Sequence, residues 1–68
     1  MKINEQLRKY RKLNKKTQLE IAEVLKMSRT GYASLEQGLA EPNIYIIIKL
    51  CQYYKITSDE LIGYNSEK

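Results

Sequence analysis

The sequence has no histidine, only one cysteine and one proline, and three glycines among 68 residues. It also lacks a paired-carboxylate motif and a glycine-rich loop that could hold a phosphate, so the usual residues of an active site are missing. Metal binding is not expected either, because His and Cys ligands are so scarce. We therefore expect no enzyme, no metal, no cofactor and no small-molecule ligand.

The single cysteine, Cys51, cannot form a disulfide within the chain, which favours a reducing, cytoplasmic environment. We expect Cys51 to be a small core residue, with a redox sensor as the alternative. No apolar run reaches the ~18 residues of a membrane span. The charged N-terminal stretch MKINEQLRKY also lacks the apolar segment of a secretory signal. These absences predict a soluble protein without a membrane partner.

Strand signals are missing as well, since the chain has neither an Asn-Gly or Asp-Gly hairpin nor sustained alternation of apolar and polar residues. Apolar residues recur at helical spacing instead. The pattern predicts an all-α fold, a compact domain of five short helices over residues 1–64, followed by a polar tail at 65–68.

Capping residues mark where several of these helices begin. Thr17 and Glu20 have the T-x-x-E spacing of a capping box, in which each side chain satisfies a backbone N–H of the other residue. Thr57 and Glu60 repeat that spacing before the fifth helix. Ser28 is a favoured N-cap and is expected to open the third helix.

Glycines and a loop mark the remaining boundaries. The first helix is expected to end near Leu13, the third at Gly38 and the fifth at Gly63. After the loop at 39–42, a fourth helix is expected to begin at Asn43. Residues expected on the buried faces are Ile3, Leu7 and Tyr10 in the first helix, Ile21, Ala22 and Leu25 in the second, Ile44, Ile47, Ile48, Cys51 and Tyr54 in the fourth, and Leu61 in the fifth.

Charge is distributed unevenly along the chain. Residues 1–32 hold nine Lys and Arg against three Asp and Glu, whereas residues 33–68 hold three against five. A basic half favours a polyanionic partner such as nucleic acid, although a merely solvated lysine face gives the same count.

Several short motifs occur in the same order and at the same spacing as in the Cro-like phage-repressor helix-turn-helix family, often called the Xre family, which the chain resembles over about residues 3–62. The residues that carry the resemblance are Arg11, Thr17-Gln18, Ile21-Ala22, Ser28-Arg29, Glu36-Gln37-Gly38, Pro42 and Asp59-Glu60-Leu61. The resemblance implies a lambda-repressor-like DNA-binding fold. It further implies a sequence-specific regulator of transcription that binds double-stranded DNA, with repression at an inverted-repeat operator as the expected activity. A protein-binding module, such as an antitoxin or a transcription-bridging factor, is the alternative.

The third helix is the expected recognition helix. At roughly 100° per residue, one arc of this helix is polar and small, while Tyr32 and Leu35 face the other way. Such an arc suits entry into a major groove about 12 Å wide. The expected base-reading residues are Arg29, Thr30, Ala33 and Ser34. For Arg29 the alternative is a surface arginine that makes one loose salt bridge, and for each of the other three it is an ordinary exposed helix residue.

A second set of residues is expected to contact the DNA backbone: Lys15, Lys16, Gln18 and Gln37. The resemblance places Gln18 where the family has a glutamine that braces against DNA and the third helix, and a tolerated residue after Thr17 is the alternative. For the two lysines the alternative is a solvated loop. The resemblance also implies that Arg11 pairs with Glu36 as a scaffold ion pair.

Because one helix-turn-helix reads only a few base pairs, a homodimer on two half-sites is expected. The interface candidates are Ile46, Tyr53, Ile62 and Tyr64, with scattered exposed apolar residues as the alternative.

Two positions near the turn before the third helix are unusual. Gly31 lies within that helix, where glycine costs up to ~1 kcal/mol relative to alanine. We interpret it as a site of close approach, by the packed second helix or by a DNA strand. Lys26 stands where the family often has glycine, so a slightly different turn is expected. In the family that this chain resembles, the loop after the third helix is usually basic. Here residues 39–42 carry no basic residue, which removes phosphate contacts that the resemblance implies.

Overall fold

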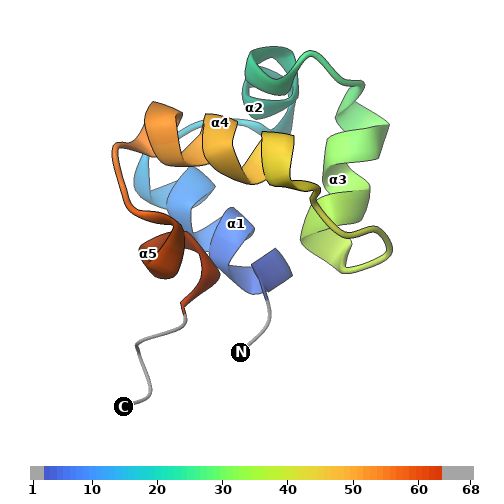
Figure 1. The fold of residues 1–68 in the computed structure, drawn as a ribbon. Coiled ribbons are helices and arrows are strands. Elements are labelled where there is room, and N and C mark those ends of the chain that lie inside the picture. Colours follow the sequence, from blue (N-terminus) through green and yellow to red (C-terminus); the bar gives the residue numbers. More distant parts are fainter. Residues whose placement is uncertain (1–2, 64–68) are drawn as a thin grey trace.

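The computed structural model describes residues 3–63, and this part of the chain folds into five α-helices without a strand (Figure 1). The helices are α1 (Ile3–Leu13), α2 (Gln18–Leu25), α3 (Arg29–Gln37), α4 (Ile44–Tyr54) and α5 (Ser58–Ile62). The predicted all-α fold of five helices is therefore confirmed. Tyr64 and the tail at 65–68 lie outside the described residues. Among residues 3–63 no helix is both long and apolar enough to cross a membrane.

Both predicted capping boxes are present. At the start of α2, the Glu20 amide donates to Thr17 Oγ1 at 3.1 Å and the Thr17 amide donates to Glu20 Oε1 at 2.8 Å. The same reciprocal pair joins Thr57 and Glu60 at the start of α5, at 3.1 and 2.9 Å. These bonds satisfy amides that have no partner within the helix, and thereby fix where each helix begins.

The core lies where the five helices meet. α3 packs on α1 and α2, while α5 packs on α1 and α4. Figure 1 shows α3 and α5 on opposite sides of the molecule. The buried apolar residues are Leu7, Ile21, Ala22, Leu25, Tyr32, Leu35, Leu50, Tyr54 and Leu61. Ile3, Tyr10, Ile47 and Cys51 are half-buried against that core.

The predicted buried face of α4 was partly wrong. Ile44 and Ile48 are 69% and 49% exposed, whereas Leu50, which was not expected in the core, is fully buried. Most residues of α4 are apolar, and its two polar residues, Lys49 and Gln52, share the side roughly opposite Leu50 and Tyr54. The contacts with α2 and α5 select a face rotated from the predicted one toward Ile46 and Leu50 by less than one residue, because Ile47, Cys51 and Tyr54 belong to both faces.

The same rotation corrects one interface candidate. Ile46, expected on the solvent side, is half-buried and packs against the core. Tyr53 and Ile62 do lie at the surface, with 36% and 38% exposure.

Candidate nucleic-acid interface

A three-residue turn joins α2 to α3. Lys26 ends α2 in the left-handed conformation, with φ 59° and ψ 45°. Met27 follows, and its amide donates to the Ala22 carbonyl at 3.0 Å. Ser28 then caps α3 by accepting from the Gly31 amide at 3.0 Å. Lysine thus takes the left-handed position usually given to glycine.

α3 presents two different faces. Tyr32 and Leu35 are buried against α1 and α2, as predicted. The proposed base-reading residues lie on the outer side, with Arg29 and Thr30 exposed and with Ala33 and Ser34 half-buried. The Ser34 hydroxyl donates to the Thr30 carbonyl at 3.2 Å, so its oxygen offers lone pairs rather than a proton to a ligand. Base reading by these four residues stays a prediction.

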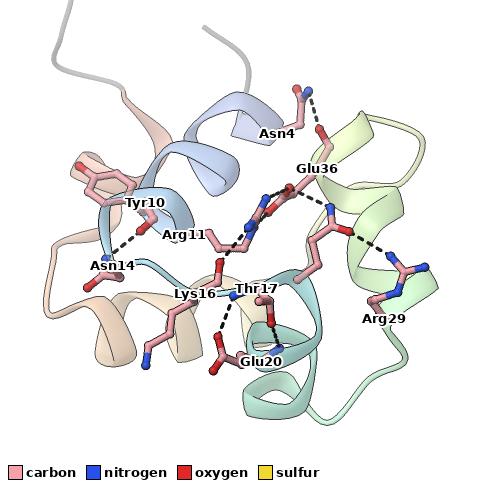
Figure 2. A network of polar contacts seen from close by, with 10 residues as sticks. Asn4, Tyr10, Arg11, Asn14, Lys16, Thr17, Glu20, Arg29 and Glu36 are labelled. Carbon is pink, nitrogen blue, oxygen red and sulfur yellow. Dashed lines mark hydrogen bonds and ion pairs between the residues drawn. The ribbon is translucent and has the colours of Figure 1, made fainter.

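Arg29 is held by a hydrogen-bonded partner from α2. Its Nη1 donates to Gln18 Oε1 at 3.1 Å. The other end of the Gln18 amide, Nε2, donates to Glu36 Oε1 at 3.1 Å. Because the carboxylate can only accept, it fixes which end of the amide faces inward, and the oxygen is left to accept from Arg29. Figure 2 shows this row of side chains running from Glu36 to Arg29.

Glu36 is also the anchor of the scaffold. Its Oε2 lies 2.6 Å from Arg11 Nε, and its Oε1 accepts from Arg11 Nη2 at 3.1 Å. A third nitrogen of Arg11, Nη1, donates to the Lys16 carbonyl at 2.8 Å (Figure 2). Only 12% of the Arg11 side chain and 3% of the Glu36 side chain are exposed. The ion pair therefore joins α1, the turn before α2 and the end of α3 in a largely dehydrated environment.

The electrostatics of Glu36 follow from these bonds. Burial disfavours its charge, but the hydrogen bond from Arg11, the nearby Tyr32 hydroxyl, the hydrogen bond from Gln18 and the charge of Arg11 together outweigh burial and hold the pKa of Glu36 below its usual value. Burial, and next the nearby Glu36 carboxylate, raise the pKa of Tyr32 far above its ordinary value. The buried Tyr32 hydroxyl lies close to that carboxylate without the geometry of a full hydrogen bond.

The predicted backbone contacts occupy three different settings. Lys15 is exposed and has φ 57° in the α1–α2 turn, whereas Lys16 is half-buried and its carbonyl binds Arg11. Gln18 forms the bridge described above, and Gln37 is exposed at the end of α3. All four lie on the turn before α2, at the start of α2 or at the end of α3.

Gly31 faces the turn. A Cβ on Gly31 would lie 3.2 Å from Ser28 Oγ and 3.3 Å from Met27 Cε, which is tighter than ordinary contact. The close neighbours are thus the N-cap and the turn side chain that precedes it. Approach by a DNA strand stays a prediction.

Sequence reasoning missed three residues near this surface. Asn4 Nδ2 donates to the Glu36 carbonyl at 3.2 Å, so α1 also holds the end of the α3 backbone. Arg8 and Lys12 line a cavity beside the Arg11–Glu36 pair. Their spacing of four residues, with Arg11 between them, was the available signal, since it places all three on one side of α1.

Comparison with known proteins agrees with this geometry. A profile of the helix-turn-helix family matches residues 7–61. The cryptic phage CTXphi transcriptional repressor RstR of Vibrio cholerae is 36% identical over 63 residues, which are 93% of this chain and 56% of the relative. The HTH-type transcriptional activator BcrR of Enterococcus faecalis is 34% identical over 63 residues, 93% of this chain and 31% of the relative.

The chain spans about half the length of the first relative and about a third of the second. No solved structure matches it significantly. The family profile nevertheless covers most of the chain, including both helices of the motif and the turn between them. The chain therefore belongs to the helix-turn-helix family, as its sequence had indicated.

Proposed function

We propose that this chain is a sequence-specific regulator of transcription that binds double-stranded DNA in the cytoplasm. The observation that carries the proposal is the bonded row from Arg11 through Glu36 and Gln18 to Arg29. It holds a guanidinium at the N-terminal end of α3, where recognition helices contact base edges. The planar fork of arginine matches O6 and N7 of guanine in the major groove.

The other residues have supporting roles in this proposal. Thr30 and Ser34 offer hydroxyl oxygens to bases, and Ala33 offers a methyl group to thymine. The backbone contacts come from Lys15, Lys16, Gln18 and Gln37, which set the position of the protein on DNA without specifying sequence. The two relatives support a regulatory role, since one is named a repressor and the other an activator. We favour repression, because it requires only that the protein occupies a promoter.

A homodimer completes the proposal, because two copies can read the two halves of an inverted repeat. The strongest surface for it is the outer side of α4, where Ile44, Tyr45 and Ile48 are 69%, 50% and 49% exposed. Tyr53 and Ile62 remain further candidates at the surface.

Selection of binding sites from a pool of random duplexes tests the proposal at near-physiological salt. We expect an enriched inverted repeat with a guanine in each half-site. In Arg29→Lys the charge is kept but the fork is lost, so discrimination at that guanine should fall by about 1–3 kcal/mol. Lys49→Arg, which also exchanges one cationic group for the other, is the control, since Lys49 lies on α4 outside the candidate interface, and its site preference should be unchanged.

Failure to enrich any sequence would contradict this function. The exposed apolar residues of α4 would then favour the protein-binding alternative. Binding of a partner protein through them would depend less on salt than binding to DNA phosphates.

A further inference from the structure

A cavity of about 240 Å³ lies between α1, the start of α2 and the end of α3. It is lined by Arg8, Arg11, Lys12, Gln18, Glu36 and Gln37. Ligand pockets for drug-sized molecules span about 300–1,000 Å³, so this cavity suits a single small group rather than a whole nucleotide.

The cavity carries an excess of positive charge. Its one carboxylate, Glu36, is bound on both oxygens, by Arg11 and by Gln18. Arg8 and Lys12 add two cations, and both side chains are exposed. Because Arg11 already compensates Glu36, the charges of Arg8 and Lys12 remain available to an anion that enters from solvent.

The cavity also continues the candidate DNA surface. Gln18 lines it and at the same time binds Arg29, and Gln37 lines it from the end of α3. The loop at 39–42, in contrast, carries Glu41 and no cation. Arg8 and Lys12 of α1 are therefore available to make phosphate contacts that this loop cannot provide.

We propose that this cavity binds one phosphodiester of the DNA backbone, with Arg8 and Lys12 as its cationic ligands. The inference rests on the proposed DNA-binding function and extends it to α1. Both side chains neutralise charge and read no base, so they contribute to affinity in a sequence-independent way.

The salt dependence of DNA binding tests the proposal. The double variant Arg8→Gln, Lys12→Gln is compared with the wild-type chain on a mixed-sequence duplex over a range of salt concentrations. Loss of one neutralised phosphate should reduce the slope of log K against log salt by about 0.9. Circular dichroism before each titration shows that the variants are folded.

Lys9→Gln, Lys49→Gln is the matched control, because it also removes two charges. Lys9 Nζ lies 5.6 Å from the centre of the Tyr10 ring, and the Tyr10 hydroxyl donates to the Glu60 carbonyl of α5, so Lys9 points away from the cavity. Lys49 lies on α4. This control should keep the wild-type slope.

Each other outcome has a distinct meaning. A wild-type slope in the Arg8, Lys12 variant would overturn the cavity proposal while leaving DNA binding intact. An equal loss in both double variants would also overturn it, since general charge would then explain the effect. Absence of wild-type binding even at low salt would overturn the proposed function together with this inference. Saturable binding of inorganic phosphate, with the DNA slope unchanged, would instead indicate a site for a free anion.

Discussion

At the scale of single residues, backbone strain is concentrated in lysines. Lys15, Lys26 and Lys55 have φ values of 57°, 59° and 59°, and each lies in a turn between two helices. A side chain in this left-handed region costs roughly 1–2 kcal/mol, so each turn is less stable than one made with glycine. The turn before α3 therefore keeps its shape because the helices around it are packed, not because Lys26 favours it.

Replacing Lys26 with glycine should relieve that strain. We expect Lys26→Gly to raise the free energy of unfolding by about 0.5–1 kcal/mol, because glycine takes positive φ freely while losing more entropy on folding. Urea unfolding monitored by circular dichroism measures the change.

Lys26→Ala is the control for that experiment. It removes the same charge and the same long side chain, but alanine is strained at positive φ like lysine. We expect no gain in stability. An equal gain in both variants would show that charge, and not backbone conformation, limits the turn.

At the scale of elements, sequence predicted the existence and ends of the helices better than their orientation. Local signals such as Thr17 with Glu20 act within four residues, so they are readable without knowledge of the fold. The buried face of α4 depends on which neighbours it meets. Lys49 and Gln52 mark one polar side of this helix, and Leu50 and Tyr54 lie roughly opposite to them, so these two residues were the available signal that Leu50 and not Ile48 is buried.

The candidate site shows the same division. The outward position of Arg29 and the pairing of Arg11 with Glu36 were expected from the motif, and both side chains of the pair meet in the structure. The bond between Arg29 and Gln18 and the cavity beside Arg8 depend on how α1, α2 and α3 pack. Local sequence signals carry no information about such packing.

The contact between α1 and α3 should make stability depend on pH. Since the pKa of Glu36 is lowered in the folded state, the unfolded chain binds more protons than the folded chain at acidic pH. The ion pair therefore contributes fully above the ordinary glutamate pKa of about 4.3. Its contribution is lost as the pH falls through the lowered pKa of the folded state.

In Glu36→Gln, that part of the pH dependence should disappear. We also expect a loss of about 3 kcal/mol at neutral pH, because the variant leaves Arg11 charged, poorly hydrated and without its carboxylate. Urea unfolding between acidic and neutral pH measures both effects. Glu23→Gln on the exposed side of α2 is the control and should keep the wild-type profile. An unchanged profile in Glu36→Gln would show that other carboxylates cause the acid sensitivity.

At the scale of the whole molecule, the candidate DNA interface and the proposed dimer contact belong to different helices. The cations of the candidate DNA interface lie on α1, the α1–α2 turn and the start of α3, whereas the exposed apolar residues of the proposed dimer contact lie on α4. One copy can therefore use both surfaces at the same time.

Replacing Ile48 with lysine tests the dimer. The side chain is 49% exposed, so we expect Ile48→Lys to shift the chain toward monomer with a change of about 0.5 kcal/mol or less in monomer stability. Sedimentation velocity measures the oligomeric state. Leu19→Lys on α2, at a residue that is 51% exposed, is the control and should sediment like wild type. If wild type and both variants sediment as monomers, the homodimer is wrong.

The bonds of Arg11 have a consequence for how the molecule opens. The guanidinium binds the Lys16 carbonyl and the Glu36 carboxylate, and Asn4 binds the backbone of α3. Detaching α3 alone would leave a buried charge unpaired, so we expect the first and third helices to exchange their amide hydrogens as one cooperative unit. We therefore expect the proposed reading surface to be as long-lived as the N-terminal helix that supports it, and a substitution that unfolds that helix to abolish DNA binding even where Arg29 is intact.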